Sequence, residues 1–315
     1  MILVSGWLVV SNQAHSYAAI LCTYNSEETV LAALKSILNQ LVTPTEVIII
    51  DDCSQDSTIE LIHNAINSLP KIKLIKNEVN LGQSASRNKA AQMAISEILV
   101  FFDDDDVSQP ERAQTHIQMH LDSADISFVS STKKYANGYS VECVNQNLSL
   151  KNLSAHDWVL KLTTGQAKPA LKNLWVPTST CAVNRTFFLA ISGFDIDMRR
   201  LEDAEFFVRA AITKGSASWS SKNLVIRNAS FAADKGGQID TQFEKNLLTK
   251  HRNLLTTRQY RNALSLSEVR SAYFSKQYVK FVWKVAINPL LLLSSMGRSI
   301  RFIKRVIHDL KKGSK

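Results

Sequence analysis

The sequence predicts an α/β protein built on a doubly wound, mostly parallel sheet with helices on both faces. Two observations predict this class. Short apolar segments alternate with amphipathic ones between residues 17 and 102, and polar clusters directly follow three of the apolar segments. Strands separated by helices in this way are typical of parallel βαβ units. The chain has 315 residues, 45% of them hydrophobic, so it can bury a large core, which excludes disorder throughout.

The expected elements follow one another along the first third of the chain. We expect strands at residues 17–24, 46–51, 71–76 and 98–102, with helices between them at 26–41, 58–69 and 84–95. Apolar residues recur at three- and four-residue spacings in the first helix, and Asn25 with Glu28 forms the expected capping pair. After Ser130 the alternation weakens, and the pattern predicts a helix near 202–212 and a short strand pair at 217–220 and 223–227.

The formal charge of +9 is concentrated at the C-terminal end. Residues 276–315 hold ten Lys or Arg and a single acid, Asp309, whereas the other residues carry 27 basic and 27 acidic groups. A neutral body does not suit a polyanion, so we expect no nucleic-acid partner. The four cysteines form no C-x-x-C pair, which indicates reduced thiols rather than a zinc site or a disulfide framework.

The chain ends differ from the body. Residues 1–16 are apolar for about ten positions but lack a basic start and a cleavage site, so we expect a loosely ordered extension or a start codon placed too early. Residues 236–315 form a basic, helical C-terminal region in which apolar residues lie among cations from residue 278 onward. Their apolar stretch is shorter than the roughly 20 residues that span a bilayer. We therefore expect reversible binding to an anionic membrane surface; the alternative is a helix pair packed on the domain.

The stretch ILVFFDDDDVSQPE, residues 98–111, places four carboxylates directly after an apolar strand. Taken alone, such a run is a solvated turn that caps the next helix. Two other strands, however, also end in polar clusters, at Thr23 to Asn25 and at DDCSQDST. Since ligands bind at the carboxyl edge of α/β sheets, this coincidence favours a shared pocket in which carboxylate oxygens hold a divalent cation.

Five segments in this order resemble the inverting family-2 glycosyltransferases, which have the GT-A fold: ILCTYN, EVIIIDDCSQDST, NLGQSASRNKA, ILVFFDDDDVSQPER and ISGFDIDMRRLEDAEFFVRAAITKG. The resemblance covers about residues 18–215. It implies a GT-A domain at 17–235, with a nucleotide-sugar half at 17–130 and an acceptor half at 131–235.

The resemblance also implies roles for single residues. Thr23, Tyr24 and Asn25 would line the donor pocket, Asp52 would contact the nucleobase, and Arg87, near a helix start, would favour the phosphates.

The acidic residues have implied roles as well. The family pattern selects Asp103 and Asp105 as the D-x-D motif, with Asp105 the principal ligand of Mn²⁺ or Mg²⁺, Asp103 the ribose or second metal contact, and Asp106 a supporting group. Asp203 would be the general base and Glu202 would shape its pocket.

The implied activity is metal-dependent, inverting transfer of one hexosyl or N-acetylhexosaminyl group from a nucleotide-diphospho-sugar, a UDP-sugar, to a glycan or lipid-linked glycan. We expect a role in cell-surface polysaccharide synthesis, on the cytoplasmic face of the plasma membrane. The chain lacks the Q-x-x-R-W signature of processive enzymes and the His that completes many metal sites. The alternatives are a sugar-nucleotide pyrophosphorylase, or a non-catalytic relative that binds membranes or nucleic acid.

Overall fold

The computed structural model describes residues 16–284 except 67–68, 70, 136–137, 165–167, 172–173, 175, 229–236, 276, 278–279 and 282. The predicted N-terminal extension up to residue 15 and most of the basic tail lie outside the described residues. The chain divides into two compact units, Met1–Leu153 with Asn173–Ser230, and Ser154–Lys172 with Phe231–Lys315. The second unit thus includes residues 154–172, whereas the predicted C-terminal region begins at residue 236.

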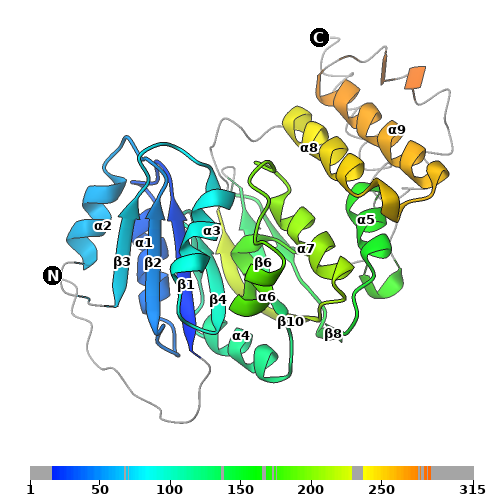
Figure 1. Cartoon of the computed structure of the whole chain (residues 1–315). Helices are drawn as coiled ribbons and strands as arrows, with labels where there is room; N and C mark the ends of the chain where they lie inside the picture. The colour runs from blue at the N-terminus through cyan, green and yellow to red at the C-terminus, as the bar shows by residue number, and fades with distance from the viewer. Residues whose placement is uncertain are drawn as a thin grey trace. The chain divides into compact units, whose positions relative to one another are not determined.

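Ten strands within the described residues form one sheet in the order β3-β2-β1-β4-β9-β6-β10-β5, with β7 on β6 and β8 on β10 (Figure 1). The strands are β1 Tyr17–Thr23, β2 Glu46–Asp51, β3 Ile72–Lys76, β4 Ile98–Asp103, β5 Asp106–Ser108, β6 Ile126–Lys134, β7 Ser140–Cys143, β8 Leu148–Leu150, β9 Cys181–Asn184 and β10 Ala217–Arg227. Strands β3, β2, β1 and β4 are parallel, as predicted, whereas β9 runs antiparallel to both β4 and β6.

Helices cover the central strands β1, β2 and β4, which are buried along nearly their whole length. The first unit contains α1 Val30–Leu38, α2 Thr58–Ile66, α3 Gln83–Met93, α4 Arg112–Leu121, α6 Arg185–Ala190 and α7 Glu202–Ile212. Alternate residues of β1, such as Ala19 and Leu21, join Leu34 of α1 and Ile117 of α4 in one buried cluster. Helix α3 packs on β1 and β2. Burying each large aliphatic side chain contributes about 1.5–3 kcal/mol.

Two local predictions are wrong. The first helix begins at Val30 rather than at residue 26, because Asn25 has a left-handed φ of 49° and its side chain accepts the Gln55 N–H instead of capping α1. The predicted strand pair at 217–220 and 223–227 is a single strand, β10, whose pairing with β6 shifts register after Trp219. In the sequence, the irregular segment within β10 therefore resembles a turn between two strands.

The second unit contains α5 Ala155–Thr164, α8 Gly237–Lys250 and α9 Thr257–Phe274. Arg270 of α9 donates to Glu244 of α8 at 2.6 Å and to a carbonyl of α5. The structure describes a few residues of the predicted tail. Phe281 is buried, with its ring centroid 5.9 Å from that of Tyr273, whereas Trp283 is 60% exposed. None of the helices among the described residues has both the length and the apolar character that crossing a membrane requires.

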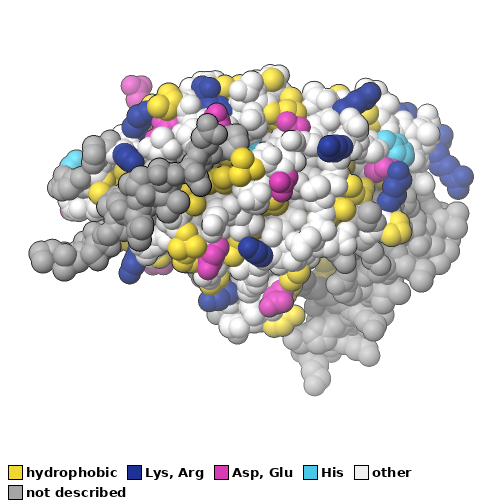
Figure 2. All heavy atoms as spheres, turned by 90° about the horizontal axis from the view of Figure 1, so that it is seen from below, with side chains coloured by type: hydrophobic (Ala, Val, Ile, Leu, Met, Phe, Trp, Pro, Cys, Tyr) yellow, Lys and Arg dark blue, Asp and Glu magenta, His cyan; other side chains and the backbone are white. Residues whose placement is uncertain are grey.

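One face of the molecule illustrates how the charges are distributed. On the face drawn in Figure 2, Lys and Arg side chains lie scattered among Asp and Glu. This distribution agrees with the neutral charge balance of the chain outside its C-terminal residues.

Candidate functional site

Three strand ends meet at one edge of the first unit's sheet. Strand β1 lies between β2 and β4, with Thr23 opposite Asp51 and Cys22 opposite Asp103. The polar residues that follow these strands therefore lie side by side, as the sequence predicts. The buried Thr23 hydroxyl donates to Asp51 at 3.2 Å, which links the first two strand ends.

The four-carboxylate row spans a turn between two strands instead of capping a helix. Asp103 ends β4, Asp104 and Asp105 form a turn, and Asp106 begins β5, which pairs antiparallel with β10. Helix α4 starts only at Arg112. If the row capped a helix, the helix would follow it directly. Strand β5 lies between the row and α4, so the alternative of a solvated helix cap is wrong.

Asp104 is not part of the cluster that its three neighbours form. Its carboxylate accepts the Tyr24 N–H at 3.1 Å and the Ser26 hydroxyl, so it fastens the loop after β1 to the acidic row. Burial raises the pKa of Asp104 to about 6, although both donors oppose the shift. These two contacts explain why the second position of the D-x-D motif takes no part in the cluster.

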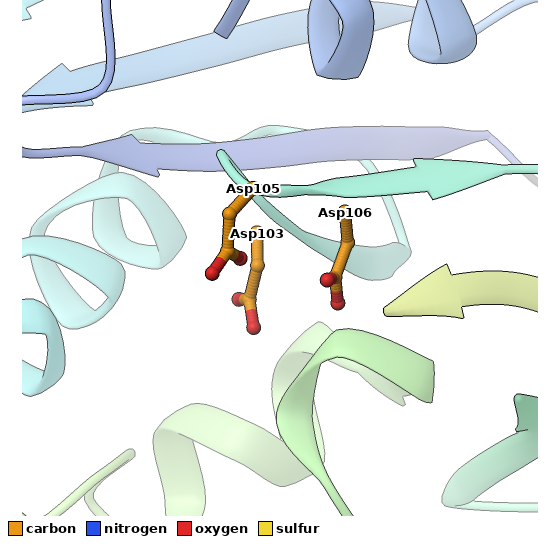
Figure 3. A group of neighbouring side chains, drawn as sticks. All are labelled: Asp103, Asp105 and Asp106. Atoms are coloured by element: carbon orange, nitrogen blue, oxygen red, sulfur yellow. The ribbon is translucent and has the colours of Figure 1, made fainter. Parts of the chain in front are cut away.

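Asp103, Asp105 and Asp106 project into one space, as Figure 3 shows, and each offers a carboxylate oxygen within 4.8 Å of the others. Burial, followed by the charges of Asp103 and Asp105, raises the pKa of Asp106 to about 8. Clustered carboxylate oxygens are the ligands that Mg²⁺ and Mn²⁺ prefer. The three residues therefore fit a divalent cation, whose charge would relieve their mutual repulsion.

Arg87 joins the acidic row to the start of α7. Its guanidinium is buried and donates to Asp103 at 2.7 Å and to Glu202 at 3.1 Å. Burial disfavours the charge, but Asp103 and Glu202 outweigh it, so the pKa of Arg87 is raised. In the described structure Arg87 thus bridges two carboxylates. Its contact with the phosphates of a donor stays a prediction.

Glu202 and Asp203 begin α7 after Leu201, whose φ of 61° is left-handed. Glu202 also accepts the Gln83 amide at 2.6 Å. Burial, with the neighbouring charge of Asp203, raises the pKa of Glu202 to about 7. Burial likewise raises the pKa of Asp203, whose carboxylate accepts the Ala204 N–H at 2.7 Å. The structure thus brings the predicted base to the edge that holds the acidic row.

Asp52 has a different environment from the other predicted site residues. Its buried carboxylate accepts the backbone N–H groups of Leu81 and Gly82 at 2.9 and 2.8 Å. Asn77 and Ser86 donate to it as well, at 2.8 and 3.1 Å. Asp52 therefore holds the segment between β3 and α3 in place, and its contact with a nucleobase stays a prediction.

Tyr24 and Asn25 lie in a loop that interlocks with the loop after β2. The Asn25 N–H donates to Ser54 at 2.9 Å, and the Asn25 side chain accepts the Gln55 N–H at 2.8 Å. The Tyr24 side chain is 48% exposed. The predicted pocket residues are thus fixed through their backbone, which leaves the aromatic ring at the surface.

Two residues that support the acidic row were not predicted. Arg112, buried at the start of α4, donates to the Phe101 carbonyl of β4 and to the Ser108 hydroxyl of β5, so it holds both strands that flank the turn. Asn228, just after β10, donates from its amide to the Asp105 carbonyl at 2.7 Å and from its backbone to Asp106 at 3.1 Å. Both residues contact other elements of the fold, and the sequence around each contains no pattern that would identify it as part of the site.

Comparisons with known proteins agree with this geometry. The sequence profile of the family described as glycosyl transferase family 2 matches residues 18–190. A Haemophilus influenzae protein named an uncharacterized glycosyltransferase is 30% identical over 190 residues, which cover 60% of each chain. The Escherichia coli enzyme WfgD, named a UDP-Glc:alpha-D-GlcNAc-diphosphoundecaprenol beta-1,3-glucosyltransferase, is 31% identical over 122 residues, covering 39% of this chain and 47% of WfgD. The matched regions thus span less than two thirds of either relative.

A solved structure has the same fold. S. aureus TarS in complex with UDP-GlcNAc superposes with a TM-score of 0.60 at 18% identity, over 89% of this chain and 81% of TarS. At this identity the similarity concerns the fold, which is the predicted GT-A fold.

Proposed function

This chain belongs to glycosyl transferase family 2, and from this premise we propose that it transfers one sugar, with inversion, from a nucleotide-diphospho-sugar to a glycan or lipid-linked glycan. Membership makes it a glycosyltransferase rather than a pyrophosphorylase, and the retained acidic cluster favours an active enzyme over a non-catalytic relative. We favour a UDP-sugar donor and a role in cell-surface polysaccharide synthesis, because WfgD is named for a UDP-Glc donor and a lipid-linked acceptor.

One observation carries this proposal: Arg87 holds Asp103 of the acidic row and Glu202 of α7 on a single guanidinium. The proposed ligands of the cation that would neutralise the donor's diphosphate and the proposed general base, Asp203, therefore belong to one site. A transfer reaction needs these two functions side by side, because the acceptor attacks the carbon from which the diphosphate leaves.

In the proposed reaction, Asp203 takes the proton of an acceptor hydroxyl as its oxygen attacks the anomeric carbon. The new glycosidic bond forms while the bond to the diphosphate oxygen breaks, and the nucleoside diphosphate leaves with the electron pair. The raised pKa of Asp203 makes it a stronger base than an ordinary aspartate. Bound by Asp103, Asp105 and Asp106, Mn²⁺ or Mg²⁺ would supply charge neutralisation for the departing diphosphate.

The test of this proposal is donor turnover by the purified full chain. Nucleotide sugars with UDP, GDP or dTDP are supplied with Mn²⁺ or Mg²⁺, with water or an added methyl glycoside as the group that receives the sugar, and release of the nucleoside diphosphate is measured with and without EDTA. We expect a UDP-sugar to be consumed and EDTA to reduce its consumption to background. Absence of turnover with every donor would contradict the function, and turnover indifferent to EDTA would contradict the metal requirement.

We further propose that the basic C-terminal residues hold the enzyme on the cytoplasmic face of the plasma membrane. Support comes from the ten Lys or Arg after residue 275, since each cation near an anionic leaflet contributes about 1 kcal/mol. Cells that express the full chain or a chain ending at Gln277 would be fractionated at low salt. Only the full chain should sediment with membranes; equal sedimentation of both, or neither, would contradict the proposal.

A further inference from the structure

An exposed pair of tyrosines lies on the hairpin that joins β6 to β7. Tyr135 is 40% exposed and Tyr139 is 63% exposed, and their ring centroids are 6.0 Å apart with the planes tilted by 32°. The Tyr135 N–H donates to the Tyr139 carbonyl at 2.8 Å, which fixes the two backbones relative to each other. The pair thus offers a preformed aromatic surface that points toward solvent rather than into a core.

The sheet register places this hairpin near the proposed active site. Asp106 of β5 pairs with Arg227 of β10, and Arg227 pairs with Lys133 of β6. Neighbouring strands lie roughly 5 Å apart, so Lys133 is about 10 Å across the sheet from the acidic row. Tyr135 follows Lys133 by two residues, beyond the end of β6. The tyrosine pair therefore lies on the same edge of the first unit as the acidic row.

The chemistry around the tyrosines suits a sugar. One face of a pyranose ring presents C–H groups, which pack on aromatic rings, while its hydroxyls need polar partners. The Lys133 ammonium lies 5.2 Å from the Tyr135 ring centroid, and Glu142 lies on β7 opposite Thr132. Aromatic surface with a few polar groups beside it is typical of sites that bind small organic ligands.

We propose that Tyr135 and Tyr139 form an acceptor platform on which a sugar unit of the acceptor glycan stacks, a few units from the one that receives the new sugar. This inference rests on the proposed function, since it names where that function's acceptor binds. A rigid tyrosine pair contributes contact area at low cost in side-chain entropy. Stacking there would lower KM for longer acceptors more than for short ones.

The test uses methyl β-glycosides of glucose, galactose, mannose and N-acetylglucosamine, at millimolar concentration with the full chain. Saturation-transfer NMR measures which sugar protons contact the protein. We expect the ring C–H protons of at least one glycoside to be saturated, and about tenfold weaker binding in Tyr135→Ala and Tyr139→Ala, given the contribution of an aromatic contact. Tyr139→Phe should restore binding because it keeps the ring.

The matched control is Phe274→Ala, which removes an aromatic side chain of similar exposure, 44%, from α9. Circular dichroism verifies that each variant is folded. Glycoside binding that is absent in the wild type, or equal in the wild type and both alanine variants, would overturn the platform. Failure of the proposed function is separate, because it would appear as absent donor turnover by the wild type.

Discussion

Buried carboxylates lie at both ends of the parallel strands, but the pKa is lowered at the amino end and raised at the carboxyl end. At the amino end of β2, Glu46 accepts the N–H groups of Ile95 and Ser96 at 2.7 and 3.0 Å, the Ser96 hydroxyl at 2.9 Å and the Lys73 ammonium at 3.4 Å. Burial would raise the pKa of Glu46, but these donors outweigh it and lower the pKa from its ordinary value of 4.5. Glu46 therefore contributes to stability as an anion.

At the carboxyl end, Asp103, Asp105 and Asp106 crowd one another, while Asp52 nearby has its own hydrogen-bond donors. Asp106 and Glu202 have pKa values raised to about 8 and about 7, first by burial and then by neighbouring carboxylates. Such groups reduce the stability of the fold when they are ionised. Glu46, whose donors lower its pKa, is structural, whereas the crowded acids Asp106 and Glu202, whose pKa values are raised, mark the place where function needs charge.

The largest effect should follow loss of the base. Asp203→Asn keeps the shape of the side chain but cannot take a proton, so we expect transfer to fall by about 10²- to 10⁴-fold with donor affinity nearly unchanged. Steady-state transfer and equilibrium donor binding measure the two quantities. Asp197→Asn, an exposed position in the preceding loop, is the matched control. Transfer above about a tenth of the wild-type rate would exclude Asp203 as the base.

A smaller effect, on stability alone, is expected at the opposite end of the sheet. Glu46→Gln replaces charge-assisted hydrogen bonds by neutral ones and should lower the free energy of unfolding by about 1 kcal/mol at neutral pH. Because the pKa of Glu46 is lowered on folding, this contribution is present above its ordinary value of 4.5 and is lost as the pH falls through the folded value. Urea unfolding across that range measures it; a variant as stable as the wild type at neutral pH would contradict the structural role.

A further expected effect is a change in the pH dependence of stability. Glu202 faces Arg87, Gln83 and Asp203, and its pKa rises from 4.5 to about 7 on folding. The folded state therefore keeps a proton that the unfolded state loses, so this group lowers stability as the pH rises between those values. Glu202→Gln should flatten the decline in urea unfolding experiments. A steeper decline in the variant would show that the charge of Glu202 stabilises the fold.

Local sequence predicted the parts of the site that depend on strand ends. An apolar run followed at once by polar residues placed Thr23, Asp52 and Asp103 at one edge, because parallel strands end together. The family resemblance, rather than the local sequence, selected Asp103 and Asp105 from the row of four, and their carboxylate oxygens do lie within 4.8 Å of each other.

Contacts between residues far apart in the sequence could not be predicted from local patterns. Arg87 and Glu202 are separated by 115 positions, and nothing near Arg87 indicates that both sides of its guanidinium are occupied by carboxylates. The start of β5 at Asp106 also depends on a distant partner, Arg227 of β10. For this reason the local sequence of the four-carboxylate row resembled a helix cap. The pairing of β5 with β10 makes the row a turn between two strands.

The most direct test of this account compares two charge-removing variants, Glu46→Gln and Asp105→Asn, one from each end of the sheet. The free energy of unfolding and the turnover of donor would be measured on the same preparations. Glu46→Gln should lose stability and keep turnover, whereas Asp105→Asn should keep stability and lose turnover by about 100-fold or more, as removal of metal stabilisation worth several kcal/mol requires. Turnover retained by Asp105→Asn, or stability lost by it as in Glu46→Gln, would contradict the account.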